Sequence, residues 1–132
     1  MLKLLRRLFR SSRGAKAAVS PLSFQPRLGQ LLSVQTEEGD FAVFKVLAVD
    51  DGGVHVRLFV QRFPSRPSLG DIRELSLASI RPEDANPFSV GHMPLSYGSF
   101  SAWLPMVVGQ ETVTYEELDG HRIWLEAQGG YF

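Results

Sequence analysis

Alternating apolar and polar positions between residues 29 and 63 predict three antiparallel strands. Gly29–Gln35 is a short strand, and Phe41–Val49 is apolar on both faces except at Lys45. A strand that is apolar on both faces is typical of the centre of a sheet. Asp50–Gly53 consists of two aspartates followed by two glycines, which predicts a hairpin turn into a third strand, Val54–Phe63.

The two faces of the central strand should both be buried. Val43 and Leu47 lie on one face, and Phe44 and Val46 lie on the other. Imperfect alternation makes Asp71–Ser79 a candidate fourth strand. Strands joined by tight turns predict a small curled antiparallel sheet, of which an SH3-like partial barrel is one form.

The pattern changes to helical spacing near the C-terminus. Arg81–Leu95 contains three prolines and is expected to be an irregular crossing segment. Ser96 is placed to cap a short helix, which Pro105 should stop. Thr114–Glu117 fits a capping box, so we expect a helix over Tyr115–Gln128, split or weakened at its internal glycine. The predicted fold class is α+β, with the sheet followed by C-terminal helices.

A basic amphipathic helix is predicted at the N-terminus, over residues 1–13. Its apolar arc is Leu2, Leu4, Leu5, Leu8 and Phe9, and its basic arc is Lys3, Arg6, Arg7, Arg10 and Arg13. Prolines and Gly14 make residues 14–27 a linker. The chain thus divides into an arm with its linker, residues 1–27, and one globular domain, residues 28–132.

The net charge of zero conceals a division between the arm and the domain. Residues 1–36 hold seven basic and no acidic residues, so the remainder carries seven basic and 14 acidic residues. Such asymmetry predicts that the arm binds a different partner from the domain. Candidate partners for residues 1–20 are an anionic membrane surface and RNA.

Composition restricts the location and chemistry of the protein. The chain has no cysteine, which excludes disulfides and thiol chemistry. No apolar stretch is long enough to span a membrane, and basic residues interrupt what would be the apolar region of a signal peptide. We expect a cytoplasmic protein, with a peripheral position at the inner membrane face as the alternative that the arm suggests.

The three histidines are widely spaced in the sequence. His55, His92 and His121 show no metal-ligand spacing, so no metal site is predicted, although a site assembled in three dimensions remains an alternative. His92, Ser96 and Asp119 are residue types of a catalytic triad, but no Gly-x-Ser-x-Gly motif accompanies them. The sequence therefore predicts no catalytic residue, no cofactor and no small-molecule substrate.

Basic and aromatic residues also accumulate on the third strand and after it. Arg57, Arg62, Phe59 and Phe63 could form a nucleic-acid-binding face, an alternative that the acidic domain disfavours. Together with the arm, they complete the candidate binding residues: Lys3, Arg6, Arg7, Arg10, Arg13, Arg57, Arg62 and His92.

Four segments carry a resemblance: Phe44–Asp50, Val54–Leu58, His92–Ser96 and Glu117–Trp124. They resemble a family of uncharacterised small bacterial proteins, some of which are similar to immunity proteins encoded near polymorphic toxins. The resemblance excludes the arm and implies no catalytic residues. It implies a non-enzymatic module that binds a protein partner, for which an acidic domain suits a basic toxin. The alternative function is a peripheral protein held at a membrane or on RNA by the arm.

Overall fold

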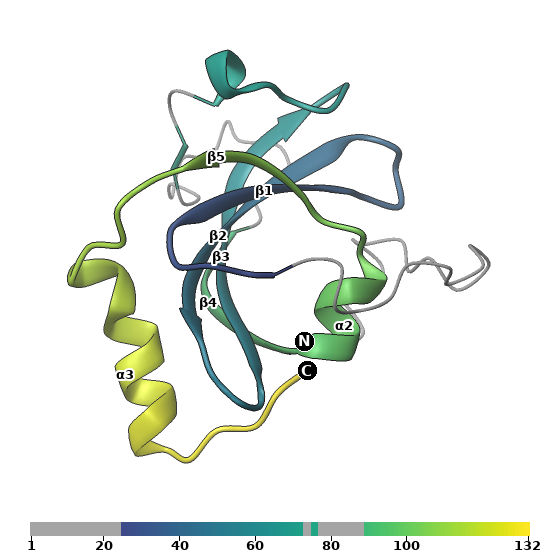
Figure 1. Cartoon of the computed structure of the whole chain (residues 1–132). Helices are drawn as coiled ribbons and strands as arrows, with labels where there is room; N and C mark the ends of the chain where they lie inside the picture. The colour runs from purple at the N-terminus through teal and green to yellow at the C-terminus, as the bar shows by residue number, and fades with distance from the viewer. Residues whose placement is uncertain (1–24, 73–74, 77–88) are drawn as a thin grey trace, which may run out of the picture.

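The computed structural model describes residues 25–72, 75–76 and 89–132 and shows an α+β fold (Figure 1). Its strands are β1 (Gln30–Gln35), β2 (Phe41–Val49), β3 (Gly53–Phe63), β4 (Val90–Ser96) and β5 (Met106–Gln110). They form an open antiparallel sheet in the order β4-β3-β2-β1-β5. Strands β1 and β5 cross over the other strands in Figure 1, so the sheet is strongly curled.

The predicted central strand and hairpin are confirmed. β2 lies between β1 and β3, and its pairing with β3 runs from Phe41 opposite Phe63 to Val49 opposite Val54. The turn is closed by the Asp50 carboxylate, which accepts hydrogen bonds from the backbone N–H groups of Gly52 and Gly53.

Both faces of β2 are buried, as the two-sided apolar pattern predicts. The main core comprises Leu32, Val34, Ala42, Phe44, Val46, Val54, Val56, Leu58, Met93, Leu95 and Phe100. A smaller core on the opposite face comprises Leu31, Val43, Phe59 and Ile72. Leu47 is also buried.

The fourth strand is not where the sequence pattern places it. The crossing segment expected at Arg81–Leu95 instead contains the start of β4, which continues to Ser96 despite Pro94. Proline is tolerated there because β4 lies at the edge of the sheet, where one side of the strand needs no ladder partner. In the expected strand Asp71–Ser79, Asp71 ends the 3₁₀ helix η1 (Leu69–Asp71), and the described residues beyond it are not in a strand.

The predicted helix caps are present, but the C-terminal helix is shorter than predicted. α2 (Tyr97–Ala102) begins after Ser96, whose hydroxyl accepts a hydrogen bond from the Ser99 N–H. The capping-box contacts between Thr114 and Glu117 are present. The single helix expected after them is instead a 3₁₀ turn, η2 (Glu116–Leu118), followed by α3 (Asp119–Glu126).

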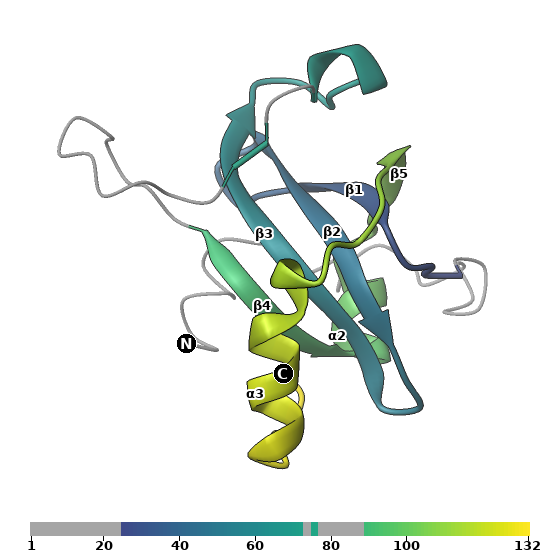
Figure 2. The same ribbon diagram turned by 90° about the vertical axis from the view of Figure 1, so that its left-hand side faces the viewer.

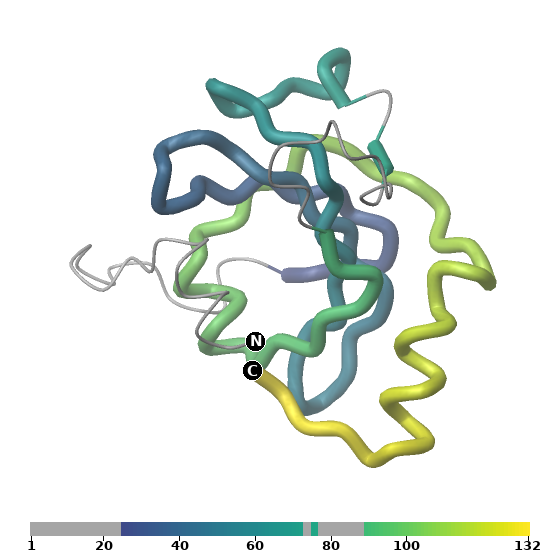
Figure 3. The backbone as a smooth tube through the Cα atoms, turned by 180° about the vertical axis from the view of Figure 1, so that it is seen from behind, coloured from purple at the N-terminus to yellow at the C-terminus, as the bar shows by residue number. Residues whose placement is uncertain are grey.

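The two helices lie on opposite faces of the sheet (Figure 2). Beyond α3 the chain returns to the end of β4 (Figure 3), where the Phe132 N–H donates to the Pro94 carbonyl and the Ser96 N–H donates to the Phe132 carbonyl. None of the described helices is long and apolar enough to cross a membrane. The predicted arm helix, residues 1–13, lies outside the described residues.

Candidate functional site

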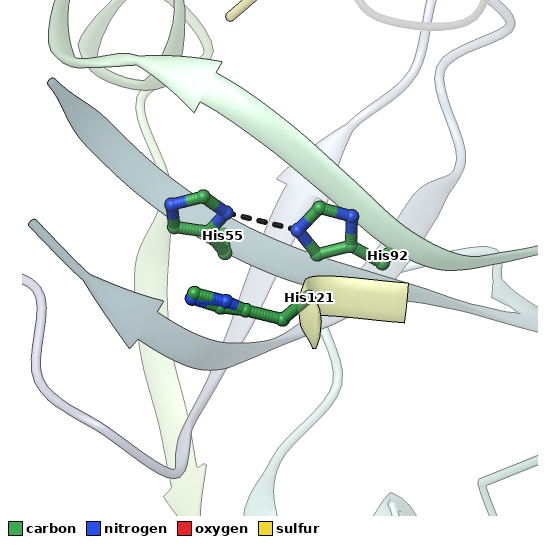
Figure 4. A group of neighbouring side chains, drawn as sticks. All are labelled: His55, His92 and His121. Atoms are coloured by element: carbon green, nitrogen blue, oxygen red, sulfur yellow. Dashed lines mark hydrogen bonds between the residues drawn. The ribbon is translucent and has the colours of Figure 1, made fainter. Parts of the chain in front are cut away.

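Three histidines from distant parts of the chain meet on the face of the sheet covered by α3 (Figure 4). His55 comes from β3, His92 from β4 and His121 from α3. Val54 and Val56 point into the main core, so strand alternation directs His55 to the opposite face. Each histidine offers one ring nitrogen, and these three atoms lie within 4.8 Å of one another. We call these residues the histidine cluster.

His55 is held at both of its ring nitrogens. Its Nδ1 lies 2.9 Å from Nε2 of His92, and its Nε2 lies 2.7 Å from Oδ2 of Asp50. The His55 side chain is completely buried, so neither position is open to water.

The Asp50 carboxylate fixes the proton on His55. Its other oxygen accepts hydrogen bonds from the Tyr131 hydroxyl and from the hairpin amides. Partial burial raises the pKa of Asp50, but the bonds from Tyr131, His55 and the amides outweigh it and lower the pKa to about 2. An ionised carboxylate only accepts hydrogen bonds, so Nε2 of His55 carries a proton and donates it to Asp50.

Aromatic rings enclose the cluster. The His121 ring stacks on His55 with centroids 4.4 Å apart, and Trp124 meets His55 edge-on at 4.5 Å. Burial, followed by the neighbouring histidines, lowers the pKa of His92 to about 4. Burial and His55 also lower the pKa of His121, with Asp50 opposing them. His92 and His121 are therefore neutral near pH 7.

One buried nitrogen in the cluster lacks a hydrogen-bond partner among the described residues. Nδ1 of His121 is buried and has no hydrogen-bond partner within the described part of the chain. Buried polar atoms in native proteins are almost always paired, so an orphaned imidazole nitrogen is a sign of an unfilled interaction.

A glycine allows α3 to approach β4 closely enough to form the cluster. A Cβ atom added at Gly120 would lie 2.5 Å from the Cβ of His92, a separation that real side chains do not adopt. Gly120 therefore sets the distance at which its neighbour His121 meets the sheet.

An ion-pair network anchors the segment before α3 to the same face of the sheet. Lys45 of β2, only 3% exposed, donates to Glu117 at 2.9 Å and to the Thr112 carbonyl at 2.7 Å. Arg57 of β3 lies 3.6 Å from the other Glu117 oxygen. Burial raises the pKa of Glu117, but the hydrogen bonds from Lys45 and Thr114 and the charge of Lys45 give a net lowering. Glu117 thus remains ionised and compensates the buried Lys45.

The chemistry available to the histidine cluster is metal coordination. Neutral imidazole is a ligand for Zn²⁺ and related transition ions. Among the described residues, this is the one group of three or more ligand-type side chains close enough to share an ion. Spacings of 37 and 29 residues concealed the cluster in the sequence, and the one available signal was the placement of His55 on the face opposite the core.

The structure separates most of the other candidate residues. Of the predicted binding residues, His92 belongs to the cluster, Arg57 pairs with Glu117, and Arg62 lies 3.5 Å from Asp40. The five basic residues of the arm lie outside the described residues. Of the triad residue types, Ser96 caps α2 and Asp119 pairs with Arg122.

In comparisons with protein-family models, curated proteins and solved structures, this chain gave no match.

Proposed function

We propose that this protein is a non-enzymatic binding module that engages a basic protein partner along strand β5. The observation that carries the proposal is the exposure of apolar side chains on an outer strand. Met106 is 52% exposed and Val107 is 48% exposed, although they are consecutive residues of a strand. Leu104 and Leu28, close to the two ends of β5, are exposed as well.

An outer strand of this kind is suited to accept another strand. β5 pairs with β1 on one side, and no strand of the described chain pairs with its other side. Natural edge strands are commonly protected by charge or proline, yet Met106–Gln110 contains neither. Addition of a partner's extended segment to such an edge provides backbone hydrogen bonds, while exposed side chains provide the apolar contacts.

The charge of the domain favours a basic partner. Residues 28–132 carry seven basic and 14 acidic residues. Glu111 follows β5 directly, and its side chain is 49% exposed. Complementary charge accelerates and orients docking, which is what an immunity-type inhibitor of a basic toxin requires. A partner of this class and a bacterial cytoplasmic location are parts of the same proposal.

The connectivity of the sheet supports an SH3-like partial barrel. Strands β1 to β4 follow one another in space, and β5 returns to pair with β1. Small barrels of this form serve many functions, so this resemblance in form adds no partner of its own.

The proposal is tested by comparative capture with the full chain as bait. The baits are wild type, Val107→Asp on β5, and Ile123→Asp on α3 as a matched control at a residue that is 66% exposed. We expect a basic protein to be retained by wild type and Ile123→Asp and lost by Val107→Asp, and the purified pair to form a salt-sensitive complex. Binding along β5 would be contradicted if only Ile123→Asp lost the partner, or if Val107→Asp retained every protein that wild type retains.

The second candidate function depends on the arm. Its sequence separates five basic from five apolar residues within residues 1–13, which favours a peripheral protein held at an anionic membrane surface or on RNA. Both functions can coexist, because the arm and β5 belong to different parts of the chain.

A further inference from the structure

We propose that His55, His92 and His121 bind one divalent first-row transition-metal ion, with Zn²⁺ as the representative ion. This site is separate from β5 and does not depend on the proposed function. The proposal stands on the convergence of three side chains from β3, β4 and α3, whose ring nitrogens lie within 4.8 Å of one another.

The distances are within reach of side-chain rotation. A tetrahedral Zn²⁺ ion bound at about 2.0–2.1 Å requires ligand nitrogens about 3.3 Å apart. The His55–His92 pair, at 2.9 Å, needs to open slightly, and the more distant nitrogen of the cluster needs to close by about 1.5 Å. His92 and His121 are only partly buried, so their rings have room to turn.

The hydrogen bond between His55 and His92 holds a proton where the ion would lie. That proton must leave the space between Nδ1 of His55 and Nε2 of His92 before both nitrogens can face the ion. When the ion binds, this proton passes to Nδ1 of His92 or to solvent, and both facing nitrogens direct lone pairs to the metal.

Asp50 supplies the outer support that metal-binding histidines normally have. Its carboxylate accepts the Nε2–H of His55 at 2.7 Å, which orients the ring and makes Nδ1 more basic. Tyr131 and the hairpin amides in turn hold Asp50. A carboxylate–histidine–metal arrangement would therefore form without any movement of β3.

The orphaned nitrogen of His121 is a second, independent indication. Its buried Nδ1 has no partner within the described residues, and coordination through this nitrogen would satisfy it. A set of three imidazoles selects Zn²⁺, Co²⁺, Ni²⁺ or Cu²⁺ over Mg²⁺ and Ca²⁺, which prefer oxygen ligands. Three protein ligands also leave a fourth position for water or a group from a partner.

The test uses the untagged full chain, because its three histidines are then all members of the cluster. Titration with Zn²⁺ should show one ion per chain, and one equivalent should shift the imidazole nitrogen resonances of all three histidines in NMR spectra. Co²⁺ should give the visible absorption of a four-coordinate site. Unshifted imidazole resonances would overturn the proposal without recourse to any variant.

Substitutions identify the ligands. His92→Ala and His121→Ala alter partly buried side chains, and each should reduce the affinity for Zn²⁺ by more than about 100-fold. That loss exceeds the one expected when a residue that only hydrogen-bonds to a ligand is removed. Asp50→Asn should reduce affinity by about 10–100-fold. Asp51→Asn, on the exposed position beside it, is the matched control and should leave affinity unchanged. Equal affinity in wild type and both histidine variants would show adventitious surface binding and contradict the site.

Discussion

At the scale of single residues, the close approach of α3 to the sheet depends on a glycine rather than on an apolar contact. α3 buries none of its residues, and Ile123 and Leu125 are exposed. Its position is fixed instead where Gly120 passes over His92 and where the His121 ring stacks on His55. Side-chain volume at position 120 therefore controls the histidine cluster.

We predict that Gly120→Ala destabilises the protein although alanine favours helices. Helix propensity would contribute about 1 kcal/mol in favour of alanine. The new Cβ, however, would meet the His92 Cβ at 2.5 Å, and overpacking of this kind costs about 1–3 kcal/mol. Chemical denaturation should therefore show a net loss of stability.

Gly98→Ala in α2 is the matched control for that experiment. Apart from its chain neighbours and the backbone of α2 itself, no described atom lies within 4 Å of the position that its Cβ would occupy. This variant should be neutral or more stable by up to about 1 kcal/mol. If Gly120→Ala also raised stability, the close approach of α3 to β4 would be wrong.

At the scale of elements, the segment before α3 is attached to the sheet by charge. Glu117 lies in η2, between the Thr114 cap and α3, and it compensates Lys45 beneath it. Removing one partner of a buried ion pair costs more than the pair contributes, because the remaining charge stays buried.

We predict that Glu117→Gln destabilises the fold by about 2 kcal/mol near pH 7. The folded pKa of Glu117 lies below its ordinary value of 4.5. Its contribution is therefore complete above about pH 4.5 and is lost as the pH falls through the folded pKa. Unfolding measured from pH 7 to pH 3 should show a shallower acid loss in Glu117→Gln than in wild type.

Glu111→Gln provides the comparison at this element. Glu111 lies 3.4 Å from the same Lys45 nitrogen but is half exposed, so its loss should cost less than about 1 kcal/mol. Equal effects of the two substitutions at all pH values would show that Glu117 has no special role in holding η2.

At the scale of the whole molecule, the described elements begin after the predicted arm. β1 starts at Gln30, and Phe132 at the other end of the chain packs against the main core. The described sheet and core are thus built from residues within 28–132.

We predict that the full chain co-sediments with anionic vesicles at low salt. Exposed charges are screened over roughly 8 Å at physiological ionic strength, so raised salt should weaken this binding. Replacing Arg6, Arg7 and Arg10 with Glu should abolish it and leave the melting temperature unchanged. Wild-type protein that ignores vesicles, with a melting temperature lowered by deletion of residues 1–20, would contradict the anchor.

The sequence by itself determined the local structure of the sheet. The two-sided apolar pattern of Phe41–Val49, the Asp50–Gly53 turn and the caps at Ser96 and Thr114 all appear in the structure as predicted. These features depend on alternation and on hydrogen bonds between residues close in sequence, which the sequence displays directly.

Only the tertiary structure decided where β4 and β5 lie and which residues share a site. Pro94 conceals a strand because its edge position, which makes proline tolerable, is a property of the assembled sheet. His55, His92 and His121 come together through the β3–β4 register and the close passage of Gly120. The edge position of Pro94 and the meeting of the three histidines leave no periodic signal. Sequence spacing does not encode contacts made across strands or between a helix and a sheet.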